Sequence, residues 1–385
     1  MADGPIRVGL DLSCLMPHAP LTGVGYYTLE ITRALLTHVP GIEVRAFASA
    51  ARFAPKVVCD LAAACASARL VRWPTRLKIA LWTHIEWPPI ERFTGAIDVA
   101  HGAFHLLPAT RHAPRLVTVF DLTNFRYPEA HLSGQTHLHR TMLRHAVRRA
   151  DALVAISKSA GADLVELLGA DESKVRVVYG GVMLDEFSGD LDRAALDKAK
   201  GRFGITRDYF IHLGTLEPRK NVPRLLEAYA RVRERRADCP QLVLTGKAGW
   251  LCEPIFETIE ARGLHDAVVC TGYIDRAEAV LLLRGARACV YPSLYEGFGL
   301  PVLEAMAAGV PVMTSNVSSL PEVAGDTGIL VNPEDVDALV SGIEQLIDDE
   351  SGNAVRVSAA RARAATFTWA DSAAALASVY RWLAG

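Results

Sequence analysis

Short apolar runs alternate with longer stretches of helical spacing along nearly the whole chain. Six runs lie in the first half, at residues 6–12, 43–48, 98–102, 115–121, 152–157 and 175–181. Six more lie in the second half, at residues 209–214, 241–246, 267–272, 288–293, 311–315 and 328–332. Their unbroken apolar content predicts strands buried on both faces of parallel sheets, and the alternation predicts βαβ units.

The series of strands restarts after a polar helical stretch at residues 189–208. This predicts two doubly wound α/β domains, one spanning residues 1–188 and the other residues 205–366. The last stretch, residues 367–385, has helical spacing and four aromatic residues. We expect it to form a helix that packs back across the N-terminal domain.

Composition narrows the class of protein. The 385 residues carry a net charge of −2, which gives no global attraction to nucleic acid. The seven cysteines are scattered and form no Cys-x-x-Cys pair, so neither a disulfide framework nor a zinc site is expected. The sequence shows neither a signal-peptide pattern nor a run of 18 apolar residues. We therefore expect a cytoplasmic protein.

Two glutamates lie eight positions apart in "YEGFGLPVLEA", residues 295–305. Paired carboxylates often indicate acid–base hydrolysis. Here Glu296 is predicted in a loop and Glu304 one turn inside a helix that begins near Pro301. The amides between them form a helix N-terminus, which attracts phosphate. Either the glutamates bind hydroxyls on each side of a diphosphate, or Glu304 is an exposed helix residue and Glu296 a charge favoured by the helix dipole.

Two further stretches suit an anionic ligand. In "LGTLEPRKN", residues 213–221, Arg219 and Lys220 follow a strand and precede a helix, where the dipole disfavours cations. A diphosphate explains them better than a solvated basic pair. In "LTGVGYY", residues 21–27, Gly23 and Gly25 either allow a ligand to approach the backbone closely or form only a tight turn between strand and helix.

Two features of the first half remain open. Asp121 lies where a buried strand ends, which favours a role in a cleft over one as a helix cap or salt-bridge partner. The helix at 137–149 has a basic face that includes Arg140, Arg144, Arg148 and Arg149. That face is either solvated or meets anionic lipid or a diphosphate-linked acceptor.

Residues 292–335, together with "LGTLEPRKNVPRLLEAY" before them, resemble the glycosyltransferase family 4 pattern. This is a retaining family of GT-B fold that includes bacterial mannosyltransferases of polysaccharide and O-antigen assembly. The likeness is dense in the C-terminal half and looser in the N-terminal half, through "TGVGYYT", "TVFDLTNFRYPE", "AISKSA" and "GGV". It implies an N-terminal acceptor-binding domain and a C-terminal nucleotide-sugar-binding domain, both Rossmann-like, facing each other across a cleft.

The resemblance also implies roles for particular residues. Arg219 and Lys220 would bind the donor diphosphate and stabilise the leaving group, Glu296 would contact the transferred sugar, and Glu304 would hold the ribose. The remaining implied donor contacts are Gly23, Gly25, Gly214, Thr215, Gly272, Tyr273, Ile274, Phe298, Gly299 and Leu300. The expected catalytic residues are Asp121, Arg219, Lys220 and Glu296, with no metal and no cofactor.

The sequence departs from the family pattern in two places. Many relatives carry a histidine at the end of the strand "VTVFD", where this chain has Phe120 and Asp121. We expect Asp121 to orient the acceptor hydroxyl or to accept its proton. Residues 179–182, "YGGV", stand where many relatives have Pro-Asn-Gly-Val.

The expected activity is transfer of a sugar, with GDP-mannose as the leading donor, to a hydroxyl of a saccharide or lipid-diphosphate-linked saccharide, with retention and without metal. The expected partners are this donor and acceptor and, through the basic helix, the inner membrane face; nucleic acid is not expected. Two alternatives are a nucleotide-sugar 2-epimerase, which needs no acceptor, and a non-catalytic nucleotide-sugar-binding subunit.

Overall fold

The chain forms two compact units in a computed structural model that describes residues 4–16, 22–50 and 55–385. The first unit comprises residues 1–128, 133–181 and 367–385, and the second comprises residues 129–132 and 182–366. The sequence predicts the boundary between the domains at residues 188–205, whereas in the structure the second unit already begins at Val182. Leu21, the first residue of the glycine stretch, lies outside the described residues.

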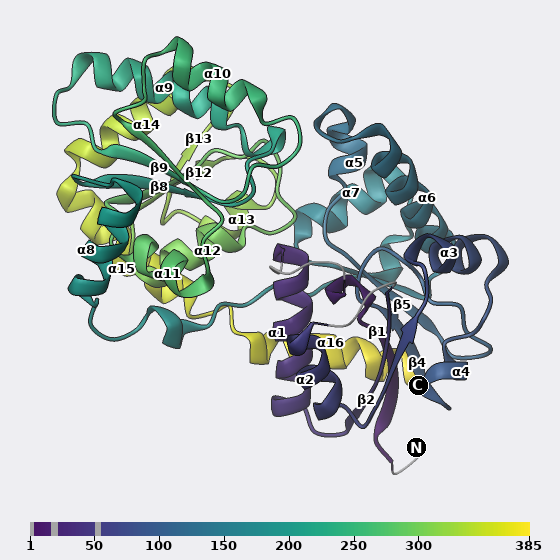
Figure 1. Ribbon diagram of the computed structural model, residues 1–385. Helices are drawn as coiled ribbons and strands as arrows, with labels where there is room; N and C mark the ends of the chain where they lie inside the picture. The colour runs from purple at the N-terminus through teal and green to yellow at the C-terminus, as the bar shows by residue number, and fades with distance from the viewer. Residues whose placement is uncertain (1–3, 17–21, 51–54) are drawn as a thin grey trace. The chain divides into compact units, whose positions relative to one another are not determined.

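The first unit is built on a seven-stranded parallel sheet with the order β3-β2-β1-β4-β5-β6-β7 (Figure 1). The central strands are buried on both faces, as their apolar sequences predict. The strands are β1 (Ile6–Asp11), β2 (Ile42–Ala50), β3 (Ser67–Arg72), β4 (Val99–Gly102), β5 (Arg115–Val119), β6 (Ala152–Ala155) and β7 (Val175–Val177).

The second unit contains a six-stranded parallel sheet with the order β10-β9-β8-β11-β12-β13. Its strands are β8 (Tyr209–Leu213), β9 (Gln241–Thr245), β10 (Val268–Gly272), β11 (Ala288–Tyr291), β12 (Val312–Ser315) and β13 (Ile329–Val331). The chain runs outward from β8 to β10 and then crosses back to β11 beside β8. Ligands of open α/β sheets bind at such a switch point, beyond the carboxyl ends of the two strands.

Helices connect the strands of both sheets. The first unit has α1 (Gly23–His38), α2 (Lys56–Ala64), α3 (Thr75–Ala80), α4 (Glu91–Thr94), α5 (Thr123–Arg126), α6 (Ser133–Arg149), α7 (Lys158–Leu168) and α16 (Trp369–Ala384). The second has α8 (Arg193–Phe203), α9 (Val222–Arg235), α10 (Glu253–Ala261), α11 (Arg276–Arg284), α12 (Leu300–Ala308), α13 (Leu320–Ala324), α14 (Val336–Asp348) and α15 (Glu350–Ala364). Short helical turns include η5 (Leu184–Phe187) and η6 (Pro218–Lys220).

The prediction of twelve strands is confirmed, and one strand was missed. β3 is mostly exposed and lies at the edge of the first sheet. An edge strand of this kind needs no continuous apolar run, so the hydrophobic pattern gave no signal for it.

The last helix, α16, lies along α1 in the first unit. Figure 1 shows α1 in purple beside α16 in yellow. Its buried Tyr380 hydroxyl is 2.7 Å from Nδ1 of His101, and the other ring nitrogen of His101 is 2.8 Å from Oγ1 of Thr118. These bonds connect α16 to β4 and β5 through side chains removed from water. Burial lowers the pKa of His101 to about 3, so the imidazole is neutral at physiological pH.

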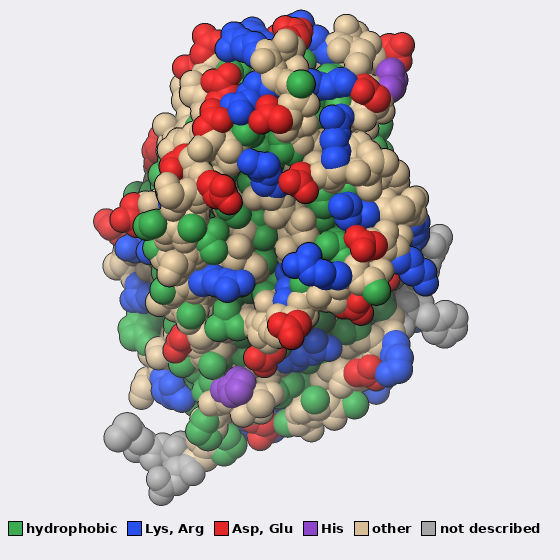
Figure 2. All heavy atoms as spheres, turned by 90° about the vertical axis from the view of Figure 1, so that its left-hand side faces the viewer, with side chains coloured by type: hydrophobic (Ala, Val, Ile, Leu, Met, Phe, Trp, Pro, Cys, Tyr) green, Lys and Arg blue, Asp and Glu red, His purple; other side chains and the backbone are tan. Residues whose placement is uncertain are grey.

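Charged side chains are mixed on the surface. On the face shown in Figure 2, basic and acidic side chains are interspersed, in keeping with the net charge of −2. Within the described part of the chain, no helix combines the length and the apolar character needed to cross a membrane.

Replacing Tyr380 with phenylalanine tests the connection between α16 and the sheet. The change removes one hydroxyl and leaves a buried imidazole nitrogen without its partner, which should lower the free energy of unfolding by about 1–3 kcal/mol. Urea unfolding of the wild type and of Tyr380→Phe measures the difference. Tyr273→Phe, which removes the hydroxyl of an exposed tyrosine, is the matched control and should change stability by less than about 0.5 kcal/mol. Equal stability of all three proteins would contradict the expected contribution.

Candidate active site

The candidate site is at the carboxyl ends of β8 and β11, the switch point of the second sheet. After β8 the chain turns at Gly214, whose φ of +133° is a conformation that residues with side chains rarely adopt. Thr215 follows, and the turn η6 then carries Arg219 and Lys220 to the start of α9. Asn221 fixes the end of this turn by donating hydrogen bonds from Nδ2 to the carbonyls of Pro292 and Pro333, at 3.1 and 2.7 Å.

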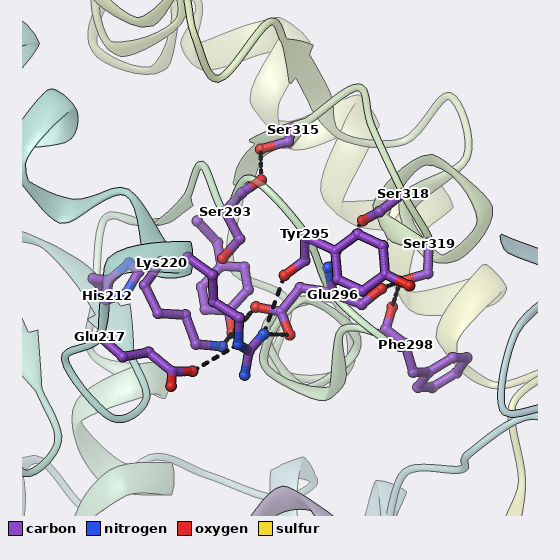
Figure 3. Close-up of polar contacts among 12 residues, drawn as sticks. His212, Glu217, Lys220, Ser293, Tyr295, Glu296, Phe298, Ser315, Ser318 and Ser319 are labelled. Atoms are coloured by element: carbon purple, nitrogen blue, oxygen red, sulfur yellow. Dashed lines mark hydrogen bonds and ion pairs between the residues drawn. The ribbon is translucent and has the colours of Figure 1, made fainter. Parts of the chain in front are cut away.

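Three residues of the predicted site meet in one buried ion-pair cluster. Glu296 accepts a hydrogen bond from Nη1 of Arg219 at 2.6 Å and another from Nζ of Lys220 at 2.6 Å (Figure 3). Lys220 is 5% exposed and Glu296 7% exposed. The basic pair is therefore not a solvated one. Glu296 also does more than place a charge near a helix N-terminus.

Burial alone would raise the pKa of Glu296, but the charges of Arg219 and Lys220 outweigh it and lower the pKa to about 2. The carboxylate therefore remains ionised over the physiological range. A buried charge of this kind is tolerated because two cations and their hydrogen bonds compensate for the lost hydration.

Further residues complete the cluster and were not predicted. Glu217 accepts a bond from Nε of Arg219 at 2.7 Å and so orients the guanidinium. The Tyr291 hydroxyl accepts a bond from Lys220 and donates one to Glu296 at 3.0 Å. His212 stacks on the Tyr291 ring, and burial lowers the pKa of its imidazole to about 4. Glu217 and Tyr291 stand beside the predicted residues in the sequence, but only the fold shows that they contact them.

The loop after Glu296 forms the N-terminus of α12, as predicted. The Ser319 hydroxyl donates to the carbonyls of Glu296 and Phe298, at 2.9 and 2.7 Å. The Ser318 hydroxyl accepts the amide of Glu296 at 3.0 Å. Gly299 precedes Leu300 with a φ of +112°, and a Cβ there would lie 2.9 Å from Leu320. Two serines after β12 therefore shape the backbone that the sequence assigned to donor binding.

Glu304 has a separate environment on the same helix, α12. Its Oε1 accepts a hydrogen bond from Nη1 of Arg276 at 2.6 Å, and its side chain is 13% exposed. Burial raises the pKa of Glu304, with Arg276 opposing the effect. Glu304 is thus not an ordinary exposed helix residue.

The expected base-binding segment lies at the carboxyl end of β10. Gly272 has a φ of +67°, Tyr273 is 55% exposed, and Ile274 is buried. Asp275 then caps α11 by accepting the amide of Glu278 at 2.9 Å. The contacts that the structure describes for Tyr273 and Ile274 do not bear on the expected contact with a base. That role therefore stays a prediction.

Gly23 and Gly25 belong to the first unit, at the start of α1. An added Cβ at Gly23 would meet nothing within 4 Å, so its surroundings are open. Neither glycine has a positive φ, so the backbone conformation does not require them. Their expected role beside a ligand stays a prediction.

Asp121 also belongs to the first unit, just beyond β5. Its Oδ1 accepts the amide of Thr123, the first residue of α5, at 3.1 Å, while the N-cap position of that helix is Leu122. His105 lies nearby and accepts the Phe120 amide through Nε2 at 3.1 Å. Burial and His139 lower the pKa of His105 to about 3, so its imidazole is neutral. The catalytic role of Asp121 stays a prediction.

The basic helix α6 is partly engaged within its own unit. Arg140 donates from Nε to the carbonyl of Asn124 at 2.8 Å, and the guanidinium groups of Arg140 and Arg144 lie over the ring of Phe125. Arg149 forms an ion pair with Glu86 at 2.9 Å. Contact of α6 with an anionic membrane surface stays a prediction.

Within residues 4–16, 22–50 and 55–385, no group of three or more His, Cys, Asp or Glu side chains is arranged to hold a metal ion.

Comparison with known families matches both halves of the chain. A model described as "Glycosyltransferase Family 4" matches residues 21–186, and one described as "Glycosyl transferases group 1" matches residues 195–363. The O-antigen chain mannosyltransferase B of Escherichia coli is 29% identical over 373 residues, which cover 94% of this chain and 97% of that protein. The serotype-specific mannosyltransferase WbdA of E. coli is 31% identical over 227 residues, 58% of this chain but only 28% of WbdA.

Solved structures share the fold at lower identity. Sucrose-phosphate synthase from Thermosynechococcus elongatus superimposes with a TM-score of 0.77 at 21% identity, covering 98% of this chain and 99% of that one. Anabaena HepE in complex with UDP-glucose gives a TM-score of 0.72 at 18% identity, covering 97% and 99%. WaaG, a glycosyltransferase of lipopolysaccharide biosynthesis, gives 0.73 at 17% identity, covering 97% and 99%.

Two parallel-sheet α/β units and these structural neighbours define a GT-B fold, which confirms the predicted fold class. Within that class, the chain belongs to glycosyltransferase family 4, as its sequence motifs indicated.

The opposite environments of Glu296 and Glu304 predict opposite effects of pH on stability. The folded-state pKa of Glu296 is about 2, below the ordinary 4.5, so its stabilisation is present above pH 4.5 and lost as the pH falls toward 2. The pKa of Glu304 is raised, so its contribution is present below its unfolded-state pKa and lost as the pH rises through the folded-state pKa.

Urea unfolding of the wild type, Glu296→Gln and Glu304→Gln between pH 7 and pH 3 measures these effects. The stability advantage of the wild type over Glu296→Gln should shrink on acidification, from a full value on the order of 3 kcal/mol. Its advantage over Glu304→Gln should grow instead. A change in the same direction for both variants would contradict the assigned environments.

Proposed function

We propose that this glycosyltransferase moves a mannosyl group from GDP-mannose to a hydroxyl of a saccharide or lipid-diphosphate-linked saccharide, with retention at the anomeric carbon. The observation that carries the proposal is the buried Arg219–Lys220–Glu296 cluster at the switch point of the second sheet. The names of the E. coli relatives support mannose as the sugar.

Arg219, Lys220 and the amides at the start of α12 would stabilise the leaving nucleoside diphosphate. Negative charge grows on the phosphate oxygen as the glycosidic bond breaks, and preorganised donors lower the barrier most at that point. Among the described residues, Tyr291 and Glu296 accept hydrogen bonds from Nζ of Lys220, which engages two of the three N–H groups of the ammonium. The third is available for a phosphate oxygen.

Glu296 would accept a hydroxyl of the transferred sugar. A carboxylate has about four acceptor sites, and the described donors to this one are Arg219, Lys220 and Tyr291. One site therefore remains for a hydroxyl. Its low pKa makes Glu296 a weak nucleophile, which favours attack by the acceptor on the same face within an ion pair over a covalent glycosyl-enzyme.

The two cations would replace the divalent metal used by other transferases, so we expect catalysis without metal. On the acceptor side, Asp121 would orient the hydroxyl or accept its proton. His105, beside Phe120 and neutral at physiological pH, lies close to this position in the first unit.

The reaction is tested by incubating the protein with GDP-mannose, UDP-glucose or UDP-N-acetylglucosamine, with and without saccharide acceptors. We expect slow release of GDP from GDP-mannose that acceptor stimulates and that EDTA leaves unchanged. Conversion of one donor into another without acceptor would identify an epimerase, and binding without turnover would identify a non-catalytic subunit. A strict need for a divalent ion would contradict the metal-free mechanism.

Removing either cation should slow the reaction more than it affects folding. Arg219→Ala or Lys220→Ala should lower kcat by 100-fold or more, equivalent to about 3 kcal/mol, because a group that stabilises the leaving charge is lost. Arg231→Ala, which removes an arginine that pairs with Glu227 on α9, is the matched control and should keep full turnover. Thermal unfolding confirms that each variant folds, and a loss below threefold in a folded variant would rule out the assigned role.

A further inference from the structure

Arg276 joins two carboxylates from different parts of the second unit. Its Nη1 donates to Glu304 on α12 at 2.6 Å, while Nε and Nη2 donate to Oε2 of Glu186 at 3.0 and 2.5 Å. Glu186 lies in the turn η5, which packs against both α11 and α12. The guanidinium group also lies over the ring of the buried Phe187, 5.6 Å from its centroid.

The position of Arg276 in the sequence does not favour a cation. It is the first residue of α11, where the helix dipole repels positive charge. Glu304 and Glu186 offset this cost from outside the helix. The guanidinium fork has separate edges, and each edge here serves a different carboxylate. Contact with η5 therefore fixes the direction in which Arg276 meets Glu304.

Glu304 needs such a partner if it is to accept hydroxyl groups. Its side chain is largely buried, and burial favours the protonated form of the carboxyl, whereas Arg276 favours the ionised form. An ionised carboxylate accepts two hydroxyl hydrogen bonds more strongly than a protonated one does. Arg276 occupies Oε1, which leaves acceptor capacity on Glu304 for the vicinal hydroxyls of a ribose.

We propose that Arg276 is a positioning residue for nucleotide recognition: it orients Glu304 toward the donor ribose, and Glu186 holds Arg276 in place from the other side. The inference rests on the proposed function and deepens it, because it concerns the nucleoside part of the donor. It also makes η5, just after the chain enters the second unit, part of the support of the nucleotide site.

The test compares GDP with 2′,3′-dideoxy-GDP, which lacks both ribose hydroxyls, by isothermal titration calorimetry. The wild type should prefer GDP, and Glu304→Gln should lose the preference. Arg276→Ala should weaken GDP binding about five- to tenfold, the effect of one hydrogen bond to a charged group, and leave dideoxy-GDP binding unchanged. Glu186→Gln should weaken GDP binding about two- to threefold, because Arg276 keeps its bond to Glu304 and loses only the charge of its second partner.

Arg284→Ala is the matched control, since Arg284 lies on the same helix and bonds to the carbonyl of Gly189, beyond η5. It should leave both affinities unchanged. In turnover assays, Arg276→Ala should raise the KM for the donor and leave kcat within twofold. If Arg276→Ala does not fold, Arg276→Lys and Glu186→Gln apply the same comparison.

The possible outcomes distinguish a failure of this inference from a failure of the proposed function on which it rests. Equal losses for GDP and dideoxy-GDP in Arg276→Ala would show a merely structural role, and tighter GDP binding would show that Arg276 competes with the ribose; either overturns the inference. Preference lost in Glu304→Gln but kept in Arg276→Ala would overturn the inference alone. A preference that survives Glu304→Gln, or a wild type that binds no nucleoside diphosphate, would overturn the proposed site itself.

Discussion

The second unit depends on a buried balance of charge, in which Arg219 and Lys220 are held by Glu217 and Glu296. Charges removed from water are stable only when their partners are fixed at close range. The balance therefore constrains every segment that supplies a partner: the turn after β8, the loop after β11 and, through Ser318 and Ser319, the loop after β12. Strand order makes these segments neighbours, because β8, β11 and β12 are adjacent in the sheet.

The same strand order explains why residues distant in sequence contact one another. Parallel strands place all their carboxyl ends at one edge of a sheet, and ligands of such sheets bind at that edge where the strand order reverses. Glu296 reaches Lys220 across 76 residues of sequence because of this topology. The first sheet has its own switch between β1 and β4, where the buried ion pair of Asp11 with Lys78 is found.

Much of this architecture could be read from the sequence, and the failures have physical causes. Strands buried on both faces have continuous apolar sequences, so twelve were found, while the exposed edge strand β3 lacks that signature. Arg219, Lys220 and Glu296 could be proposed because loops at strand ends have recognisable motifs. Glu217, Tyr291 and Arg276 could not, because their roles follow from distances between elements that periodicity does not encode.

The two glutamates of "YEGFGLPVLEA" show why spacing alone is ambiguous. A retaining hydrolase needs one carboxyl that keeps its proton and another that is free to attack, both at the scissile bond. The structure does give the pair different proton affinities, lowered at Glu296 and raised at Glu304. Yet each carboxylate is already bound by cations, Arg219 and Lys220 for one and Arg276 for the other. Carboxylates held in this way are suited to accept hydrogen bonds from hydroxyl groups. The arrangement therefore favours binding of a substrate's hydroxyl groups over acid–base hydrolysis.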